Sequence, residues 1–177
     1  MILEEFFNEG RDRYCYLVSS NSAAEAAVVD PVPEDIDLYQ ARISERNLKL
    51  AYVLQTHGDP DTAHAAERLR REAGSRWVAP RDAAAPQADV RVGHGDALTL
   101  GNLTVRVGQC ANTAAGRVSY RVGDCFFRGD DVVVAGGGVV RIPSPTAAST
   151  AAATAPPAAA TQNDCRRGEE PTEARNE

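Results

Sequence analysis

The chain has 177 residues, 43% of them hydrophobic and 25% charged, which suits one domain with a single buried core. Its formal net charge of −6 argues against a nucleic-acid partner, because phosphates require a basic surface. No apolar run is long enough to cross a membrane, and the acidic residues 1–13 are not expected to form a signal peptide. The four cysteines form no CxxC pair, which predicts free thiols and a cytoplasmic protein.

Two short apolar runs at 14–20 and 25–31 predict an early β-hairpin. The next segments alternate in type: a helix at 33–47, a buried strand at 48–56, a helix at 59–74 and a strand at 75–80. Antiparallel strands joined by glycine-containing turns are then expected over residues 97–108, 117–129 and 131–138. A strand–helix–strand unit followed by a strand meander predicts a mixed α/β fold.

The composition changes near Arg141. Residues 142–177 contain one Ile and no Val, Leu, Phe, Tyr, Trp or Met, so they cannot bury enough apolar surface to offset their ordering entropy. We therefore expect a folded domain at 1–141 and a disordered low-complexity tail at 142–177. The alternative is an alanine-rich arm whose partial helicity is interrupted by prolines.

The stretch 54–64, LQTHGDPDTAH, permits two interpretations. His57, Asp59 and Asp61 are metal-ligand types that follow a buried strand. The same letters also describe the start of a helix, with Asp59 as N-cap, Pro60 in the first helical position and Asp61 in the first turn. A helix cap requires no metal.

Several motifs carry a family resemblance: VVDP at 28–31, YVLQTH at 52–57, GDALTLGNLTVRV at 95–107 and GRVSYRVGDCFFRGDDVVVAGGG at 116–138. In their order and spacing, residues 1–141 resemble the N-terminal portion of the metallo-β-lactamase fold, in the branch of persulfide dioxygenases and glyoxalase II. The resemblance implies an α/β sandwich of the αββα type, in which two sheets face each other with helices outside. It also implies a metal loop of the form THxHxDH, followed by a TPGHT turn and an aspartate in an FTGD segment.

Matched to those motifs, this chain departs from the family at several ligand positions. His57 and Asp61 stand where the family has its first histidine and its aspartate. The histidines that follow are replaced by Asp59 and Thr62 in the loop and by Thr113 in the turn. Asp130 occupies the position of the FTGD aspartate, so the resemblance implies a residual metal site of His57, Asp59, Asp61 and Asp130.

This donor set predicts lost catalysis. A persulfide dioxygenase holds Fe(II) with two histidines and a carboxylate, whereas the corresponding residues here are His57, Thr113 and Asp130, and a threonine hydroxyl is a poor ligand. A dinuclear hydrolase needs several histidines for its metals. We therefore expect a non-catalytic pseudoenzyme without a cofactor. Two alternatives stay open: an Fe(II)- or Zn-dependent enzyme acting on glutathione-linked substrates, or an oxygen-rich Mg²⁺ or Mn²⁺ site that also includes Asp131.

The resemblance ends near Gly138, before the C-terminal half that completes the family's sandwich. Either the reading frame was lost there or the tail is a genuine linker. An incomplete sandwich is expected to leave apolar sheet surface open, which predicts self-association or a protein partner. An accessory subunit of a larger complex is a further alternative.

Overall fold

The computed structural model describes residues 1–109, 116–129 and 132–134. Its elements are β1 (Ile2–Asn8), β2 (Arg13–Ser19), β3 (Glu25–Val29), the 3-10 helix η1 (Pro33–Asp35), α1 (Ile36–Glu45), β4 (Lys49–Leu54), α2 (Pro60–Ala73), β5 (Arg76–Pro80), β6 (Val90–Val92), β7 (Ala97–Leu100), β8 (Leu103–Gln109), β9 (Val118–Val122), β10 (Cys125–Phe127) and β11 (Val132–Val134). The predicted tail at 142–177 lies outside the described residues, as do Cys110, Thr113, Asp130 and Asp131.

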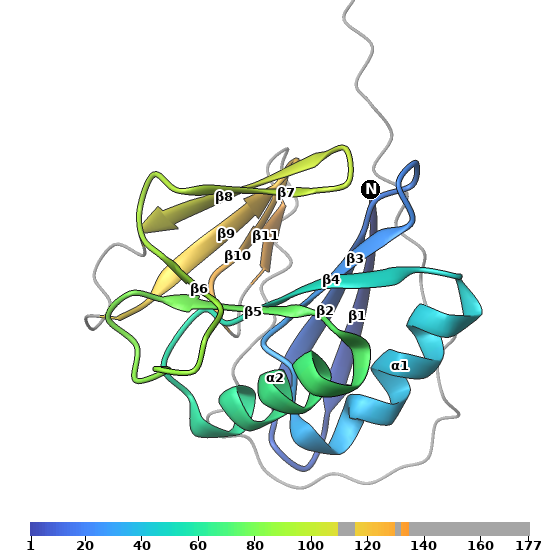
Figure 1. Cartoon of the computed structure of the whole chain (residues 1–177), viewed down its shortest axis with the longest axis horizontal. Helices are drawn as coiled ribbons and strands as arrows, with labels where there is room; N and C mark the ends of the chain where they lie inside the picture. Colours follow the sequence, from blue (N-terminus) through green and yellow to red (C-terminus); the bar gives the residue numbers. More distant parts are fainter. Residues whose placement is uncertain (110–115, 130–131, 135–177) are drawn as a thin grey trace, which may run out of the picture.

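The strands form two sheets that face each other (Figure 1). The six-stranded sheet has the order β1-β2-β3-β4-β5-β6, antiparallel from β1 to β3 and parallel from β3 to β6. The five-stranded sheet has the order β11-β10-β9-β8-β7 and is antiparallel throughout. Helices α1 and α2 cover the outer face of the six-stranded sheet (Figure 1). The described residues thus provide one helical layer and both sheets of the predicted α/β sandwich.

Two hydrophobic cores hold these layers together. The first lies between the helices and the six-stranded sheet, where the predicted helical positions Ile36, Tyr39 and Ile43 of α1 are buried together with Leu69 of α2. The second lies between the two sheets and includes Tyr16, Leu54, Val78, Tyr120 and Phe127. Burial of these large side chains is the main contribution to the stability of the sandwich.

Helix α2 has the boundaries that its sequence predicts. It begins at Pro60 behind the N-cap residue Asp59 and ends at Ala73, and its C-cap residue Gly74 adopts a left-handed conformation with φ of 66°. The backbone N–H of Gly74 donates to the carbonyl of Arg70 and closes the last turn. Since the two ends of α2 are determined locally, the first turn of the helix has a defined position relative to β4.

Two strands were not expected from the sequence. The first is β1, whose pattern of neighbouring glutamates and phenylalanines alternates poorly, but which pairs along its whole length with β2. The second is β6, a strand of three residues that pairs in parallel with β5. Both are edge strands of the six-stranded sheet, and tertiary pairing decides their conformation more than local propensity does. In the described part of the chain, no helix is both long and apolar enough to cross a membrane.

Candidate functional site

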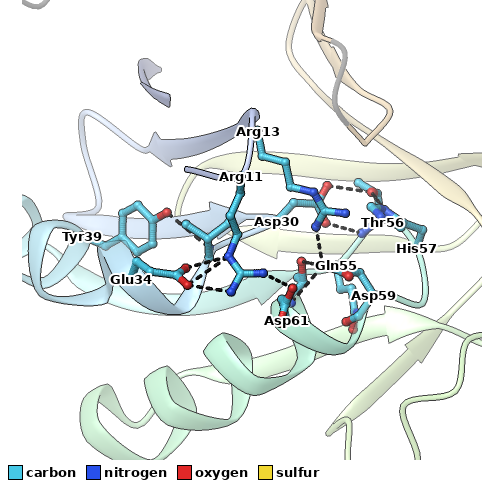
Figure 2. A network of polar contacts seen from close by, with 12 residues as sticks. Arg11, Arg13, Asp30, Glu34, Tyr39, Gln55, Thr56, His57, Asp59 and Asp61 are labelled. Carbon is cyan, nitrogen blue, oxygen red and sulfur yellow. Dashed lines mark hydrogen bonds and ion pairs between the residues drawn. The ribbon is translucent and has the colours of Figure 1, made fainter. Parts of the chain in front are cut away.

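The predicted metal loop lies between β4 and α2, at the carboxyl end of the parallel strands (Figure 2). In open α/β sheets this edge is the usual place for ligand-binding residues. The loop is tied to both sheets by backbone hydrogen bonds. Gln55 N donates to the carbonyl of Val78 on β5 at 2.9 Å, and Val118 N, at the start of β9, donates to the carbonyl of Thr56 at 2.9 Å. The loop is therefore held where the two sheets meet.

Asp30, directly after β3, anchors the loop from the neighbouring strand. Its carboxylate accepts a hydrogen bond from Thr56 N at 2.8 Å and another from Thr56 Oγ1 at 2.6 Å, and both residues are buried. Asp30 adopts a positive φ of 46°, which aspartate tolerates better than most residues. The aspartate of the motif VVDP thus positions the metal loop, a role that the sequence alone did not reveal.

The same network orients His57. Thr56 Oγ1 lies 2.9 Å from His57 Nδ1. The single proton of the Thr56 hydroxyl is directed to Asp30, because a carboxylate can only accept. Thr56 Oγ1 must therefore accept from Nδ1–H, which assigns the Nδ1–H tautomer to a neutral His57 and leaves the lone pair on Nε2. A hydrogen bond from one ring nitrogen of a histidine fixes the tautomer and orients the ring, so that the other nitrogen can act as a ligand or a base.

Gln55 connects the loop to the core. Its side chain is almost completely buried; it accepts a hydrogen bond from Trp77 Nε1 at 3.1 Å and donates one to the carbonyl of Asp59 at 3.1 Å. Its backbone carbonyl accepts from the hydroxyl of Tyr120 at 2.8 Å. Residues of β5 and β9 thereby determine the path of the loop.

Asp59 is the N-cap of α2, as the helix-start interpretation predicts. Its Oδ2 accepts hydrogen bonds from Thr62 N at 3.1 Å and Thr62 Oγ1 at 2.8 Å, and forms an ion pair with Arg13 of β2. Partial burial by itself raises the pKa of Asp59, but the hydrogen bonds from Thr62 and the contact with Arg13 outweigh it and lower the pKa below its ordinary value. Asp59 is therefore held as a carboxylate by three donors at Oδ2.

Asp61 lies in the first turn of α2 and also contacts an arginine (Figure 2). Arg11, in the turn between β1 and β2, pairs with Asp61 through one nitrogen and with Glu34 of η1 through the others, at 2.6 and 3.0 Å. The hydrogen bond from Arg11 lowers the pKa of Glu34. Ion pairs of Arg11 thus attach the β1–β2 turn to η1 and to the first turn of α2.

These contacts test whether the loop fits a metal. Thr62, at the position of a family histidine, is buried and donates its hydroxyl to Asp59. The two carboxylates of the loop are each occupied by a guanidinium group. Among the described residues, no three His, Cys, Asp or Glu side chains converge as a ligand group. The donor set within this part of the chain, with His57 as its one nitrogen ligand, does not fit the iron or zinc site that the resemblance implies.

The FFRGD segment approaches the loop from the five-stranded sheet. A Cβ atom at Gly129 would lie 3.5 Å from Thr56 Oγ1 and 3.8 Å from His57 Nδ1. The two motifs that the resemblance assigns to one site are therefore neighbours in space at Gly129. Asp130 itself, the fourth predicted ligand, lies outside the described residues.

The remaining reactive side chains lie elsewhere. His64 and His94 are exposed, on α2 and in a turn before β7, respectively. Cys15 and Cys125 are buried, and burial raises the pKa of the Cys15 thiol to about 12. A thiol with so high a pKa is a poor nucleophile at neutral pH.

The charge of Asp59 predicts an acid-dependent stability. Because its folded-state pKa lies below the ordinary value of 3.8, its ionised form stabilises the fold above that value, and the contribution is lost as the pH falls through the folded pKa. We expect Asp59→Asn, which keeps a capping side chain, to lower the free energy of unfolding by about 1 kcal/mol at neutral pH, and we expect this difference to shrink as the pH falls through the folded pKa of Asp59. Urea unfolding of both proteins at neutral and at acid pH measures the difference, and a difference that does not depend on pH contradicts the prediction.

Sequence reasoning did not identify Arg11, Arg13, Asp30 or Gln55 as part of this site. Arg11 and Arg13 belong to a hairpin that is more than forty residues away from Asp59 and Asp61 in the chain. The one usable signal was VVDP, because an aspartate directly after a buried strand lies at the same sheet edge as the end of the next parallel strand.

The chain is similar to known proteins across most of its length. Residues 9–153 match the family model described as the metallo-beta-lactamase superfamily. The chain is 29% identical over 141 residues to the mitochondrial persulfide dioxygenase ETHE1 of Mus musculus, covering 78% of this chain and 55% of that protein. It is 32% identical over 131 residues to a hydroxyacylglutathione hydrolase of Cereibacter sphaeroides, covering 72% and 51%, respectively. The chain thus spans about half the length of the curated relatives it matches.

Solved structures agree with the fold. The crystal structure of ETHE1 from Myxococcus xanthus matches with a TM-score of 0.66 and 30% sequence identity, covering 70% of this chain and 55% of that one. A metallo-beta-lactamase from Staphylococcus aureus, 17% identical with a TM-score of 0.61, shows the same fold. The predicted family resemblance and the two-sheet α/β architecture are confirmed: the chain belongs to the metallo-beta-lactamase superfamily.

Proposed function

We propose that this protein is a non-catalytic member of its superfamily, a pseudoenzyme that serves as a binding or structural component. The observation that carries the proposal is that both carboxylates of the loop already have partners within the chain. Asp59 caps α2 and pairs with Arg13, and Asp61 pairs with Arg11. A metal ion at Oδ2 of either carboxylate would have to displace an arginine, and at Asp59 also the capping contacts with Thr62.

Thr62, which stands where the family has a histidine, supports the same conclusion. Its hydroxyl is buried and directed at Asp59, so this side chain stabilises the cap instead of facing an open coordination position. The helix start therefore works as an internally satisfied unit. A hydrolytic or oxidative reaction of the kind named for the relatives requires open coordination positions on a metal.

One observation favours a second candidate, a metal-dependent persulfide dioxygenase or glyoxalase II-type thioester hydrolase with non-standard ligands. The hydrogen-bonded series Asp30–Thr56–His57 leaves Nε2 of His57 available as a ligand. Fe(II) or Zn²⁺ would be the metal in that case. The ligands would have to include residues outside the described ranges, with Asp130 as the first candidate.

Metal loading distinguishes the two candidates. The purified full chain is incubated with Fe(II), Zn²⁺ or Mn²⁺, desalted and analysed for metal content, alongside His57→Ala and the matched variant His64→Ala, whose side chain is exposed on α2. We expect less than about 0.1 metal ion per chain for all three proteins, since the loop lacks the nitrogen donors that hold such ions tightly.

Oxygen uptake with glutathione persulfide and hydrolysis of a glutathione thioester are measured on the same samples. Stoichiometric metal in the wild type and in His64→Ala that is lost in His57→Ala, together with turnover of either substrate, would overturn the proposal. Metal retained equally by all three proteins at a site without turnover leaves the non-catalytic proposal standing.

A structural role requires a partner, and we propose a second copy of this chain or another protein. Two large apolar side chains, Ile2 and Phe7, are exposed on β1, which is an edge strand in the described part of the six-stranded sheet. The outer face of the five-stranded sheet presents polar residues instead, among them Thr104, Arg106 and Arg121. The edge at β1 is therefore the stronger candidate for a covering partner.

Light scattering after gel filtration measures the mass of the particle, with Phe7→Glu as the variant that would disrupt pairing at this edge.

The buried thiols of Cys15 and Cys125 agree with a cytoplasmic setting, which we propose for the protein.

A further inference from the structure

We infer that Arg11 and Arg13 serve as fixed internal cations, which supply to this loop the positive charge that a bound metal ion would bring. Their ion pairs with Asp59, Asp61 and Glu34 are called the arginine latch below (Figure 2). The latch joins the β1–β2 hairpin to η1, through Glu34, and to the start of α2, through Asp59 and Asp61. This inference concerns the same loop as the proposed function and rests on it.

The stronger half of the latch is the pair of Arg13 and Asp59. The Asp59 side chain is only 11% exposed and that of Arg13 is 28% exposed, so solvent screens this pair weakly. Three donors to Asp59 converge on Oδ2, two from Thr62 and one from Arg13. A divalent cation at this carboxylate would have to displace the guanidinium group or lie beside it. Two cations bound to the same carboxylate repel each other.

The second half of the latch is Arg11, which bridges Asp61 and Glu34. The side chains of Arg11, Asp61 and Glu34 are 32%, 44% and 49% exposed, so these pairs are weaker than that of Arg13. A third contact between the same hairpin and η1 is neutral on one side, since Asn8 Nδ2 donates to Asp35 Oδ2 at 3.0 Å. Arg11 is therefore not required to hold the hairpin in place, which allows its charge to be removed without loss of the fold.

The inference predicts that removal of the arginines creates cation affinity. The probe is Mn²⁺, titrated into the full-length protein and followed by the electron paramagnetic resonance signal of the free ion. We expect no saturable binding at the loop of the wild type, and binding by Arg11→Gln/Arg13→Gln with a Kd on the order of 1 mM, typical of weak oxygen-ligand sites. Adding Asp59→Asn and Asp61→Asn to that variant is expected to abolish the binding.

The matched control is Arg68→Gln/Arg81→Gln, which removes the same charge from carboxylates outside the loop. Arg68 pairs with Asp37 and Glu72, and Arg81 pairs with Asp96. This control is expected to bind Mn²⁺ no better than the wild type. Equal gains in both double variants would show a general charge effect and would overturn the inference.

Thermal unfolding confirms that each variant is folded before the titration. If Arg11→Gln/Arg13→Gln does not fold, Arg13→Gln alone serves the test, because it removes the guanidinium group from Asp59, the less exposed carboxylate. A folded Arg13→Gln that binds Mn²⁺ no better than the wild type contradicts the inference, as does a wild type that binds Mn²⁺ through Asp59 and Asp61 with its arginines in place.

These outcomes separate the latch from the proposed function. Turnover of a persulfide or thioester that depends on His57 refutes the non-catalytic proposal, whatever the arginine variants do. Failure of the arginine variants to gain Mn²⁺ binding refutes the latch, even when the wild type holds no metal and turns over neither substrate.

Discussion

Asp30→Ala is expected to lower the free energy of unfolding by about 3 kcal/mol, because it leaves both the backbone N–H and the hydroxyl of Thr56 without their buried acceptor. Alanine also tolerates the positive φ at this position less well than aspartate does. Asp30→Asn keeps one acceptor oxygen and should have a smaller effect. Urea unfolding at neutral pH measures the three free energies.

The matched control for Asp30→Ala is Asp37→Ala. The side chain of Asp37 is 85% exposed and forms an ion pair with Arg68 at 3.1 Å. Its loss is expected to change the free energy of unfolding by less than about 0.5 kcal/mol. Equal effects of the two substitutions would show that Asp30 does not anchor the loop.

The same variant has a second readout at His57. Without Asp30, the Thr56 hydroxyl becomes free to donate to Nδ1, so the ring should shift toward the Nε2–H tautomer. Nitrogen-15 chemical shifts of the histidine rings report the tautomer, with the His57 signals identified from their loss in His57→Ala. An unchanged tautomer in folded Asp30→Ala would contradict the assigned direction of the hydrogen bonds.

Gln55→Ala is expected to lower the free energy of unfolding by about 3 kcal/mol. The substitution leaves Trp77 Nε1–H without its acceptor, removes the donor to the Asp59 carbonyl and opens a cavity between β4 and β5. Near-ultraviolet circular dichroism, dominated by the single tryptophan, should change with it. Chemical denaturation gives the free energy, and the spectrum shows whether the environment of Trp77 has changed.

Gln40→Ala provides the comparison for Gln55→Ala. The Gln40 side chain donates to Glu72 at 2.8 Å on the exposed surface of the two helices. Because water can replace this contact, the loss should stay below about 0.5 kcal/mol. If Gln55→Ala were no more harmful than Gln40→Ala, the position of the loop would not depend on the buried amide.

The loop therefore combines two features that are rarely needed together. One end is a positioned histidine, held by Asp30 and Thr56 as in a functional site. The other end is a helix start whose carboxylates are neutralised from within by arginines. Neighbouring carboxylates without a compensating cation destabilise a fold. We infer that the arginine latch supplies this positive charge at the loop.

The local sequence predicted those features of the fold that depend on interactions between residues close together in the chain. The bounds of α2 were predictable because Asp59, Pro60 and Gly74 act within one helical turn of themselves. The buried positions of α1 followed from their helical spacing. Strand β1 was missed because its pairing with β2, and not its own pattern, makes it a strand.

The sequence by itself determined most of the elements and the α/β class, because propensity, periodicity and capping act over a few residues. Its motifs carried the family resemblance, and its letters offered the helix cap at Asp59 as one of two interpretations. Only the tertiary structure decided how the letters THGDPDT are used. It brought Asp30 from β3 to Thr56, and Arg11 and Arg13 from the β1–β2 hairpin to Asp61 and Asp59. Charge pairing between segments that lie far apart in the chain depends on how the sheet and helices are assembled, and no short-range pattern records it.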